Sequence, residues 1–292
     1  RTMINITGHT GLTGLLGSPV AHSVSPLMHN EAFRYLGLDY VYLCFDVNEE
    51  TLPAAVAGLK TCGIRGFNLT MPNKNKIVEL LDELSPEAQL IGAVNTVLND
   101  NGKLIGYNTD GYGFMQSVRD AGHDITGKNI TVMGVGGASM AICAQSALDG
   151  AASVHIFARR TSRYWNRTQK FAENLSAKTG CQVCLFDNDD HTALRDSIAQ
   201  SYLLINATSV GMVPDIDDTI IKDTSLFHPE LVVADVVYEP QETRLLREAK
   251  AAGCQTFNGM YMLLHQGAKA FQIWTGQEMP VSVIKEKYFS VK

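Results

Sequence analysis

A glycine-rich turn near the middle of the sequence has the spacing of a dinucleotide-binding site. Gly134-Val135-Gly136-Gly137 follows the apolar run ITVMGV and precedes the helical pattern MAICAQSALDGA. Glycine at these positions permits a tight turn and lets backbone N–H groups approach a pyrophosphate, whose charge the helix N-terminus also favours. Ser139 stands where the simplest fingerprint has glycine or alanine, and a plain strand-turn-helix is the alternative interpretation. The pattern favours dinucleotide binding.

The end of the next predicted strand, VHIFARR, bears on the choice of cofactor. An acidic residue here would hold the ribose 2′-hydroxyl of NAD, whereas arginine suits the 2′-phosphate of NADP. The sequence has Arg159-Arg160-Thr161 and no acid at this point. The two guanidinium groups could pair with a phosphate or remain hydrated at the surface. The pattern favours NADP and leaves NAD open.

The first third of the chain carries polar residues at the ends of its predicted strands. Ser23 and Ser25 precede a helix start, where hydroxyls and free amides can receive a carboxylate. Taken singly, Ser25 is a helix N-cap ahead of Pro26, and Lys74 is a solvated lysine. Because ligands bind beyond the carboxyl ends of parallel strands, we expect four loops to share one crevice. These loops are 23–25, 68–74, 95–96 and 108–111.

Alternating strand and helix patterns surround these residues and predict an α/β fold. Strand-like runs in the first third (GLLG, YVYLCFDV, GFNLTMP, AVNTVLN) alternate with helical patterns at 25–38, 51–63 and 75–88, which predicts a mainly parallel sheet. Asn101-Gly102 predicts a tight hairpin. From Asn129 a Rossmann series begins, with further strands at QVCLF, YLLINAT, LVVADVVY and QTFN and helices at 243–253 and from residue 260.

The overall composition limits the classes of partner. The chain has 292 residues, 45% of them hydrophobic, and a formal net charge of -6. This is the composition of a folded protein of about two domains, and its net negative charge argues against a nucleic-acid binder. The sequence has neither an apolar run of about 18 residues nor the pattern of a signal peptide. We therefore expect a cytoplasmic protein that binds no membrane.

The cysteines do not predict a metal or disulfide site. Six cysteines in 292 residues are too few for a disulfide framework. Cys181 and Cys184 lie three apart in a predicted strand, so that they point to opposite faces. No second pair at finger-like spacing completes a zinc site. We expect no metal.

Eight motifs occur in order over nearly the whole chain and together resemble the shikimate/quinate dehydrogenase family. They are Ser23-x-Ser25-Pro26-x-x-His29-Asn30, Asn68-x-Thr70-x-Pro72-x-Lys74, Gly92-Ala93-Val94-Asn95-Thr96, Gly106-Tyr107-Asn108-Thr109-Asp110-Gly111, Gly134-x-Gly136-Gly137-Ala138, Asn206-Ala207-Thr208-x-x-Gly211-Met212, Asp235-x-x-Tyr238-x-Pro240-x-x-Thr243 and Gly259-Met260-x-Met262-Leu263-x-x-Gln266-Gly267-Ala268. The FARR stretch is closer to the branch that accepts both shikimate and quinate, although Thr161 stands where that branch often has an acid.

The resemblance implies a substrate-binding catalytic domain at 1–111, to which C-terminal helices at about 262–292 return, and a Rossmann domain at 112–261. It assigns the substrate carboxylate to Ser23 and Ser25. It assigns ring hydroxyl contacts to Thr70, Asn95, Asp110 and Gln266, with Tyr238 nearby. It assigns the dinucleotide to Gly134, Val135, Gly136, Gly137, Ala138, Arg159, Arg160, Thr161, Thr208, Val237 and Gly259.

The activity implied by the resemblance is the reversible NAD(P)-linked reduction of 3-dehydroshikimate to shikimate, in aromatic amino acid biosynthesis. Quinate as a second substrate stays open. Lys74 is the implied proton-transfer residue, and it would titrate with Asp110 as a coupled pair. Two alternatives remain: a nucleotide-binding regulator without activity, and a dehydrogenase of a related cyclic hydroxy acid such as an aminated shikimate analogue. The sequence also leaves a homodimer open.

Overall fold

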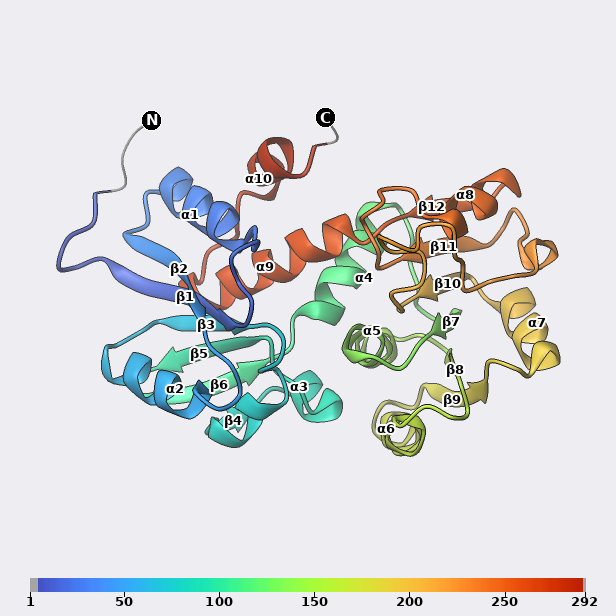
Figure 1. The fold of residues 1–292 in the computed structure, drawn as a ribbon, viewed down its shortest axis with the longest axis horizontal. Coiled ribbons are helices and arrows are strands. Elements are labelled where there is room, and N and C mark those ends of the chain that lie inside the picture. Colours follow the sequence, from blue (N-terminus) through green and yellow to red (C-terminus); the bar gives the residue numbers. More distant parts are fainter. Residues whose placement is uncertain (1–4, 291–292) are drawn as a thin grey trace. The chain divides into compact units, whose positions relative to one another are not determined.

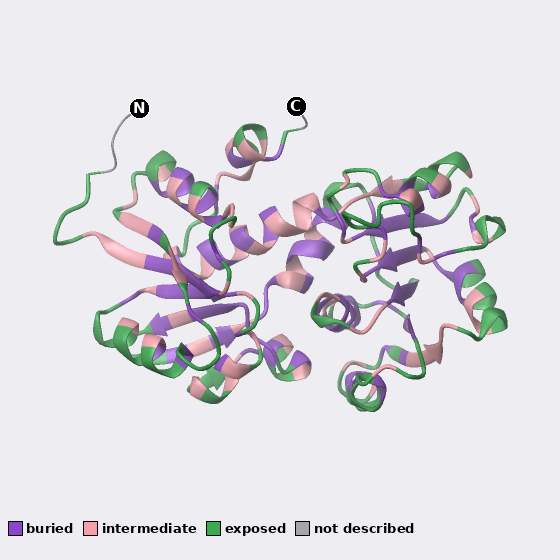
Figure 2. Cartoon of the chain, viewed as in Figure 1, coloured by how far each residue is buried: buried purple, intermediate pink, exposed green. Residues whose placement is uncertain are grey.

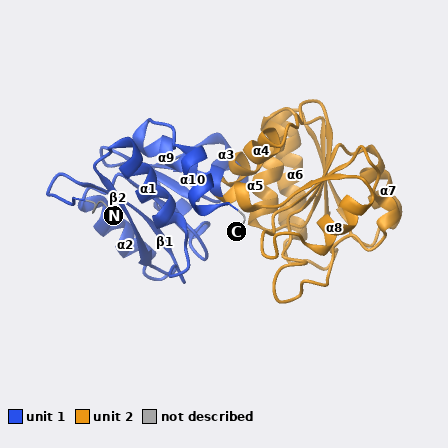
Figure 3. Ribbon diagram, turned by 90° about the horizontal axis from the view of Figure 1, so that it is seen from above, with its two compact units in different colours: residues 1–109, 264–292 blue, residues 110–263 orange. Residues whose placement is uncertain are grey.

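The structure is a computed structural model that describes residues 5–290. It contains two compact units, drawn in different colours in Figure 3. Unit 1 comprises residues 1–109 and 264–292, and unit 2 comprises residues 110–263. Each unit has its own six-stranded sheet. The chain therefore leaves unit 1, builds unit 2, and returns to complete unit 1.

Unit 1 contains a mixed sheet in the strand order β2-β1-β3-β5-β6-β4 (Figure 1). The strands are β1 (Gly11–Gly17), β2 (Tyr40–Asp46), β3 (Gly66–Leu69), β4 (Glu83–Leu84), β5 (Thr96–Asp100) and β6 (Lys103–Tyr107). β1 runs parallel to β2 and β3, and β4 runs parallel to β6. β5 is antiparallel to both β3 and β6. The parallel pairs β1-β2 and β1-β3 follow from the strand-helix alternation of the sequence, and the antiparallel pair β5-β6 follows from its hairpin.

The predicted hairpin joins β5 to β6 through Asn101 and Gly102. Both residues have positive φ, 52° and 95° respectively. This is the conformation of a two-residue turn that the Asn-Gly pair favours, since both residues tolerate the left-handed region. The Gly102 N–H also donates to the side-chain oxygen of Asn99 at 2.8 Å. The local sequence thus explains this turn completely.

Helices cover the sheet of unit 1, and its core lies between them and the strands (Figure 2). They are α1 (Ser25–Leu36), α2 (Leu52–Thr61), the 3-10 helix η1 (Lys76–Leu80), α3 (Pro86–Ile91), α9 (Met260–Thr275) from residue 264 onward, and α10 (Val281–Tyr288). The ring of His29 from α1 stacks on Tyr42 with centroids 4.5 Å apart. It also contacts Trp274 of α9, whose indole N–H donates to the Val97 carbonyl at 3.0 Å. The returning helix α9 is therefore part of this core.

Unit 2 is a Rossmann fold, as predicted. Its strands are β7 (Asn129–Met133), β8 (Ser153–Ala158), β9 (Gln182–Asp187), β10 (Leu203–Asn206), β11 (Val232–Asp235) and β12 (Gln255–Phe257). They form a parallel sheet in the order β12-β11-β10-β7-β8-β9. The strand order reverses between β7 and β10, and ligands of such sheets bind beyond the carboxyl ends at this reversal.

The helices of unit 2 surround this sheet. They are α4 (Asp110–Asp120), α5 (Gly137–Leu148), α6 (Trp165–Thr179), α7 (His191–Gln200), α8 (Arg244–Ala251) and the short 3-10 helix η2 (Thr224–Leu226). α5 packs against β7 and β8, and α6 packs against β9. The sequence patterns predicted α5 and α8 but not α6 and α7.

Two local predictions for unit 1 are wrong. Residues 75–88 do not form one helix, since η1 ends at the extended residue Leu81 and β4 separates it from α3. The hydroxyl of Ser85 accepts from the Ala88 N–H and starts α3 afresh. Ser25 is not the N-cap of α1, because Val24 holds that position and makes no side-chain cap hydrogen bond. Ser25 is the first residue inside the helix, so its hydroxyl is not used in capping.

Candidate active site

Several loops of unit 1 meet at one edge of its sheet. Asn68 near the end of β3 lies opposite Thr96 at the start of β5, and Thr96 lies opposite Tyr107 at the end of β6. The backbone continues this alignment beyond the strands, since the Val94 N–H donates to the Lys74 carbonyl at 2.8 Å. The predicted convergence of the loops after β3, before β5 and after β6 is therefore confirmed within unit 1.

A buried chain of hydrogen bonds joins polar side chains of these strands. The Tyr42 hydroxyl donates to Asn68 Oδ1 at 2.8 Å, and Asn68 Nδ2 donates to Thr96 Oγ1 at 3.0 Å. The Thr96 hydroxyl in turn donates to Asn95 Oδ1 at 3.0 Å. All four side chains are buried, Tyr42 and Thr96 completely. Because unpaired buried polar groups are costly, each member fixes the orientation of the next.

The same network reaches the returning helix α9 through Asn95. The Thr109 N–H donates to Asn95 Oδ1 at 2.8 Å, and the Thr109 hydroxyl donates to the Gln266 carbonyl at 3.0 Å. Asn95 Nδ2 lies 3.4 Å from Gln266 Oε1. The structure therefore brings together Asn95 and Gln266, two residues that are 171 positions apart in the sequence. We refer to Tyr42, Asn68, Asn95, Thr96, Thr109 and Gln266 as the amide network.

Ser23 and Ser25 lie beside the end of this network. The Ser23 hydroxyl accepts the Ser25 N–H at 3.2 Å, and the Ser25 hydroxyl contacts the phenol of Tyr42. Burial raises the pKa of Tyr42 well above its ordinary value, and the hydrogen bond with Ser25 opposes that shift. The Ser23 hydroxyl contacts Cys44, whose thiol pKa burial also raises. The phenol and thiol stay protonated at neutral pH, so the two serines face neutral neighbours that would not repel a carboxylate.

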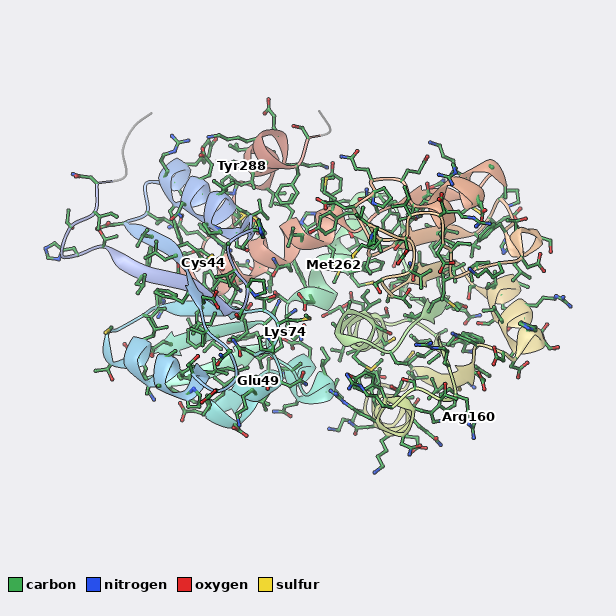
Figure 4. The ribbon with its side chains drawn as sticks, viewed as in Figure 1. Cys44, Glu49, Lys74, Arg160, Met262 and Tyr288 are labelled. Carbon is green, nitrogen blue, oxygen red and sulfur yellow. The ribbon has the colours of Figure 1, made fainter. Side chains whose placement is uncertain are left out.

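The loop after β3 carries Thr70 and Lys74, and both residues are half-buried. Lys74 is labelled in Figure 4. Thr70 lies so close to Gly17 that a side chain at position 17 would collide with its methyl group. Asn73 anchors the loop, since its buried Nδ2 donates to the Val47 carbonyl at 2.7 Å. The sequence analysis assigned no role to Asn73, although this residue lies between Pro72 and Lys74 in a motif that it singled out.

The remaining predicted substrate residues belong to unit 2. Asp110 is the first residue of α4 and directly follows Thr109 of the amide network in the chain. Tyr238 lies in the segment after β11 and is 39% exposed. Burial and the neighbouring Glu239 raise the pKa of its phenol. The pairing of Lys74 with Asp110 stays a prediction, because the two residues lie in different units.

Unit 2 contains an open cavity of about 880 Å³ at the carboxyl ends of its central strands. Its lining follows four neighbouring strands, β10, β7, β8 and β9, in their order across the sheet. The residues that line it are Gly134, Val135, Gly136, Ala158, Arg159, Thr161, Ser162, Arg163, Tyr164, Asn188, Ala207, Thr208, Ser209, Val210 and Ile220. The cavity thus lies at the reversal of strand order, where a dinucleotide is expected.

The glycine turn in this cavity has the shape that a pyrophosphate requires. Gly134 has φ +109°, and a Cβ there would come within 2.7 Å of the Thr208 methyl group. Gly136 and Gly137 have open space where a Cβ would stand, and α5 begins at Gly137. The Ser139 hydroxyl donates to the Gly134 carbonyl at 2.6 Å. The serine that replaces the glycine or alanine of the fingerprint therefore stabilises the turn. The residues present therefore fit a dinucleotide phosphate.

The arginines after β8 separate into two groups. Arg159 and Arg163 line the cavity. The Arg160 guanidinium instead lies 4.8 Å from the centre of the Trp165 ring, and Arg160 is not among the lining residues (Figure 4). The sequence analysis assigned no role to Arg163. Gly137, Ala138, Val237 and Gly259 do not line this cavity either.

A second buried network connects the two segments that carry Thr208 and Val237. Asn206 Oδ1 accepts the Thr208 hydroxyl at 2.6 Å, and Asn206 Nδ2 donates to Asp235 at 3.0 Å. Asp235 also accepts the Val237 N–H at 3.0 Å and the Thr243 hydroxyl at 2.8 Å. Burial raises the pKa of Asp235 to about 6, against the three hydrogen bonds that lower it. The sequence reading quoted Asp235 only as part of a motif.

Two kinds of site are absent from the described part of the chain. Among residues 5–290, no three side chains of His, Cys, Asp or Glu gather in a way that could hold a metal ion. Over the same residues, no helix is long and apolar enough to cross a membrane.

Comparison with known proteins identifies relatives over almost the whole length. Residues 15–97 match the family described as "Shikimate dehydrogenase substrate binding domain", and residues 259–287 match "Shikimate 5'-dehydrogenase C-terminal domain". The chain is 53% identical over 284 residues to "Shikimate dehydrogenase (NADP(+))" of Listeria innocua, with 97% of each protein covered.

Solved structures agree with this result. Shikimate 5-dehydrogenase from Listeria monocytogenes, crystallised in complex with shikimate and NAD, superposes with a TM-score of 0.94 at 52% identity over 96% of this chain and 97% of that one. Quinate dehydrogenase from Corynebacterium glutamicum in complex with NAD gives a TM-score of 0.85 at 31% identity, over 97% and 99%. With more than half of its residues identical to a full-length relative, the chain belongs to the shikimate dehydrogenase family.

Proposed function

We propose that this protein is a shikimate dehydrogenase that reversibly reduces 3-dehydroshikimate to shikimate with NADP. The observation that carries the proposal is the 52% identity and 0.94 TM-score to a Listeria monocytogenes protein crystallised with shikimate and NAD. The amide network and the cavity of unit 2 support it, because they supply hydrogen-bonding groups for a polyhydroxy acid and a cradle for a dinucleotide.

The substrate contacts divide by chemistry. Ser23 and Ser25 donate hydroxyl hydrogen bonds to the substrate carboxylate. Thr70, Asn95 and Gln266 of unit 1, together with Asp110 and Tyr238, bind the ring hydroxyls. Amide and hydroxyl groups both donate and accept, which suits an alcohol that does the same. The amide network holds Asn95 and Gln266 in place before any ligand arrives, so little side-chain entropy remains to be lost on binding.

Lys74 and Asp110 form the proton-transfer pair in this proposal. When bound, the nicotinamide supplies a hydride for the carbonyl carbon of the substrate, or receives one from the alcohol carbon. Lys74 Nζ gives the proton to the carbonyl oxygen in reduction and takes it from the hydroxyl in oxidation.

The cofactor is held by the residues of unit 2. The turn at Gly134, Val135, Gly136, Gly137 and Ala138 receives the pyrophosphate. Arg159 and Thr161 receive the ribose 2′-phosphate, with Arg160 more distant at Trp165. Thr208, Val237 and Gly259 receive the nicotinamide half. NADP is favoured by these arginines and by the name of the Listeria innocua relative, and NAD remains a second cofactor.

Quinate is a candidate second substrate. It shares the ring carboxylate and secondary alcohol of shikimate, so the same serines and amides could bind it. The similarity to quinate dehydrogenase of Corynebacterium glutamicum, at 31% identity, supports testing it.

One experiment tests the whole proposal. The purified protein is mixed with shikimate or quinate and with NADP or NAD, and the absorbance of the reduced nicotinamide is followed in all four combinations. We expect the fastest rise with shikimate and NADP. A rise only with quinate would correct the substrate, and no rise in any combination would contradict dehydrogenase activity.

A further inference from the structure

We propose that Asn188 recognises the adenine base of the dinucleotide and makes the protein selective for adenine over hypoxanthine. This inference rests on the proposed dinucleotide function and adds a base-recognising residue to it. Asn188 directly follows β9 and is one of the residues that line the cavity of unit 2.

The order of strands places Asn188 on the adenosine side of the cavity. The glycine turn follows β7, the arginines follow β8, and Asn188 follows β9, the last strand on that side of the sheet. Neighbouring strands lie about 5 Å apart, so Asn188 lies about 10 Å from the turn across the sheet. A dinucleotide with its pyrophosphate at Gly134 and its 2′-phosphate at Arg159 has its adenine one step further, at the level of β9.

The side-chain oxygen of Asn188 has an unused hydrogen-bonding capacity. Asn188 Oδ1 is buried and makes no hydrogen bond within the described residues, which is costly unless a ligand supplies the donor. The backbone of Asn188 is fixed, because its N–H donates to the Ala158 carbonyl at 2.9 Å. The terminal torsion of asparagine is broad, so a modest rotation of the amide presents the oxygen to a bound base.

Of the parts of the cofactor, the base is the one that fits a hydrogen-bond acceptor such as Asn188 Oδ1. The side-chain oxygen of Asn188 can only accept hydrogen bonds. Phosphate oxygens also accept, so the two groups would not bind each other. The 6-amino group of adenine is a donor, and an asparagine amide can accept from it while donating to a neighbouring ring nitrogen. On the base edge that carries N7, hypoxanthine presents a carbonyl in place of that amino group, so that edge has no donor for the Asn188 oxygen.

Two other residues that line the cavity, Arg163 and Tyr164, suit a flat base. The Arg163 guanidinium lies 4.7 Å from the centre of the Tyr164 ring, and both residues line the cavity. Guanidinium planes and aromatic rings stack on bases without reading their identity. Stacking by Arg163 and Tyr164 would therefore hold either base equally, and the discrimination is left to Asn188.

Equilibrium binding separates these roles. The dissociation constants of NADP and of its hypoxanthine analogue, nicotinamide hypoxanthine dinucleotide phosphate, are measured by isothermal titration calorimetry on the intact protein. We expect the wild type to bind NADP about tenfold more tightly, the effect of losing one good base contact. Asn188→Leu, which keeps the size of the side chain, should bring this ratio close to one.

Two further variants complete the test. Asn188→Asp keeps an acceptor at this position, so the preference for adenine should persist even where its charge weakens both ligands. Asn174→Leu changes an exposed asparagine on α6 away from the cavity and should keep the wild-type ratio.

Three results would overturn the assignment: equal affinities in the wild type, an unchanged ratio in Asn188→Leu, or a ratio near one in Asn188→Asp. The Asp variant keeps the test decisive if the Leu variant does not fold. Activity with shikimate in a protein that shows any of these results would leave the proposed function standing and remove only Asn188.

Discussion

The candidate binding sites of the two units consist of different kinds of groups. In unit 1, buried side chains hold one another through the amide network, from Tyr42 to Gln266. In unit 2, the lining of the cavity includes the glycine turn and two exposed arginines, Arg159 and Arg163. Hydrogen bonds among side chains fix the site in unit 1 before any ligand binds. The shape of the cavity in unit 2 depends on the path of the backbone.

This difference explains what each site can recognise. A network of fixed donors and acceptors suits a small rigid ligand whose hydroxyls must all be matched. Backbone amides and a helix N-terminus suit phosphates, which need charge and donors but little shape. Substitutions in unit 1 should therefore affect stability and substrate together, whereas substitutions in the cavity should affect the cofactor alone.

The largest expected effect lies in the chemistry that unit 1 contributes. Lys74→Ala should lower kcat by roughly 10²- to 10⁴-fold, the usual size of general acid-base effects, with a smaller change in KM for shikimate. Steady-state kinetics with NADP measures both. Lys76→Ala is the matched control, because Lys76 is an exposed lysine two residues away that pairs with Glu79. Unchanged kcat in Lys74→Ala would remove Lys74 from the mechanism.

The second prediction concerns the pH dependence of the stability of unit 1. His29 is fully buried, and burial lowers its pKa from 6.5 to about 3. Below pH 6.5 the unfolded chain takes up a proton at this position that the folded chain does not, so stability falls with falling pH. At pH 4 the loss is about 3 kcal/mol relative to pH 7.

Urea unfolding at pH 7 and pH 4 measures this loss. His29→Leu removes the titrating group from the aromatic cluster and should show a smaller decrease in the free energy of unfolding between the two pH values. An equal decrease in both proteins would show that His29 does not contribute to the acid sensitivity of unit 1.

A third substitution tests the amide network directly. Asn68→Leu removes the acceptor of the Tyr42 hydroxyl and the donor to the Thr96 hydroxyl, so we expect a loss of about 1–3 kcal/mol in the free energy of unfolding. Shikimate should bind more weakly and NADP equally well. The exposed Asn174→Leu should stay within about 0.5 kcal/mol of the wild type. Weaker binding of NADP in Asn68→Leu would contradict the separation of the two sites.

The smallest effect distinguishes two adjacent arginines of unit 2. Arg159 lines the cavity and Arg160 lies over Trp165. Arg159→Ala should weaken NADP binding by about tenfold while changing NAD binding little, because one charge-assisted hydrogen bond to the 2′-phosphate is lost. Arg160→Ala should leave both dissociation constants unchanged. The reverse pattern in calorimetry would reassign the phosphate contact to Arg160.

The sequence predicted most of the fold where local signals were strong. The Asn101-Gly102 turn, the glycine turn at Gly134 and the parallel order of β7 to β12 all follow from short-range patterns. The motif residues also indicated which loops would meet, because strand ends of one sheet must converge. The meeting of Asn95 with Gln266 required the resemblance, since no local pattern links residues 171 positions apart.

Other features lay outside what local patterns contain. α6 and α7 were missed although Gly180 ends α6 and the Asp190 carboxylate caps α7, because their polar faces weaken the apolar periodicity. The helix expected at 75–88 failed because its apolar spacing continued across the Ser85 cap that divides it. The sequence also does not show where a side chain points, and this is why Arg160 was assigned to the cofactor together with Arg159.

The return of the C-terminal segment to unit 1 has a consequence for synthesis of the protein. Trp274 donates to the Val97 carbonyl, and Lys287 donates to the buried Glu31 at 2.6 Å. Trp274 and Lys287 are synthesised only when nearly the whole chain is complete, long after their partners Val97 and Glu31. The nascent Rossmann unit can fold while translation continues, whereas the substrate-binding unit is completed last, and a truncated product would lack it.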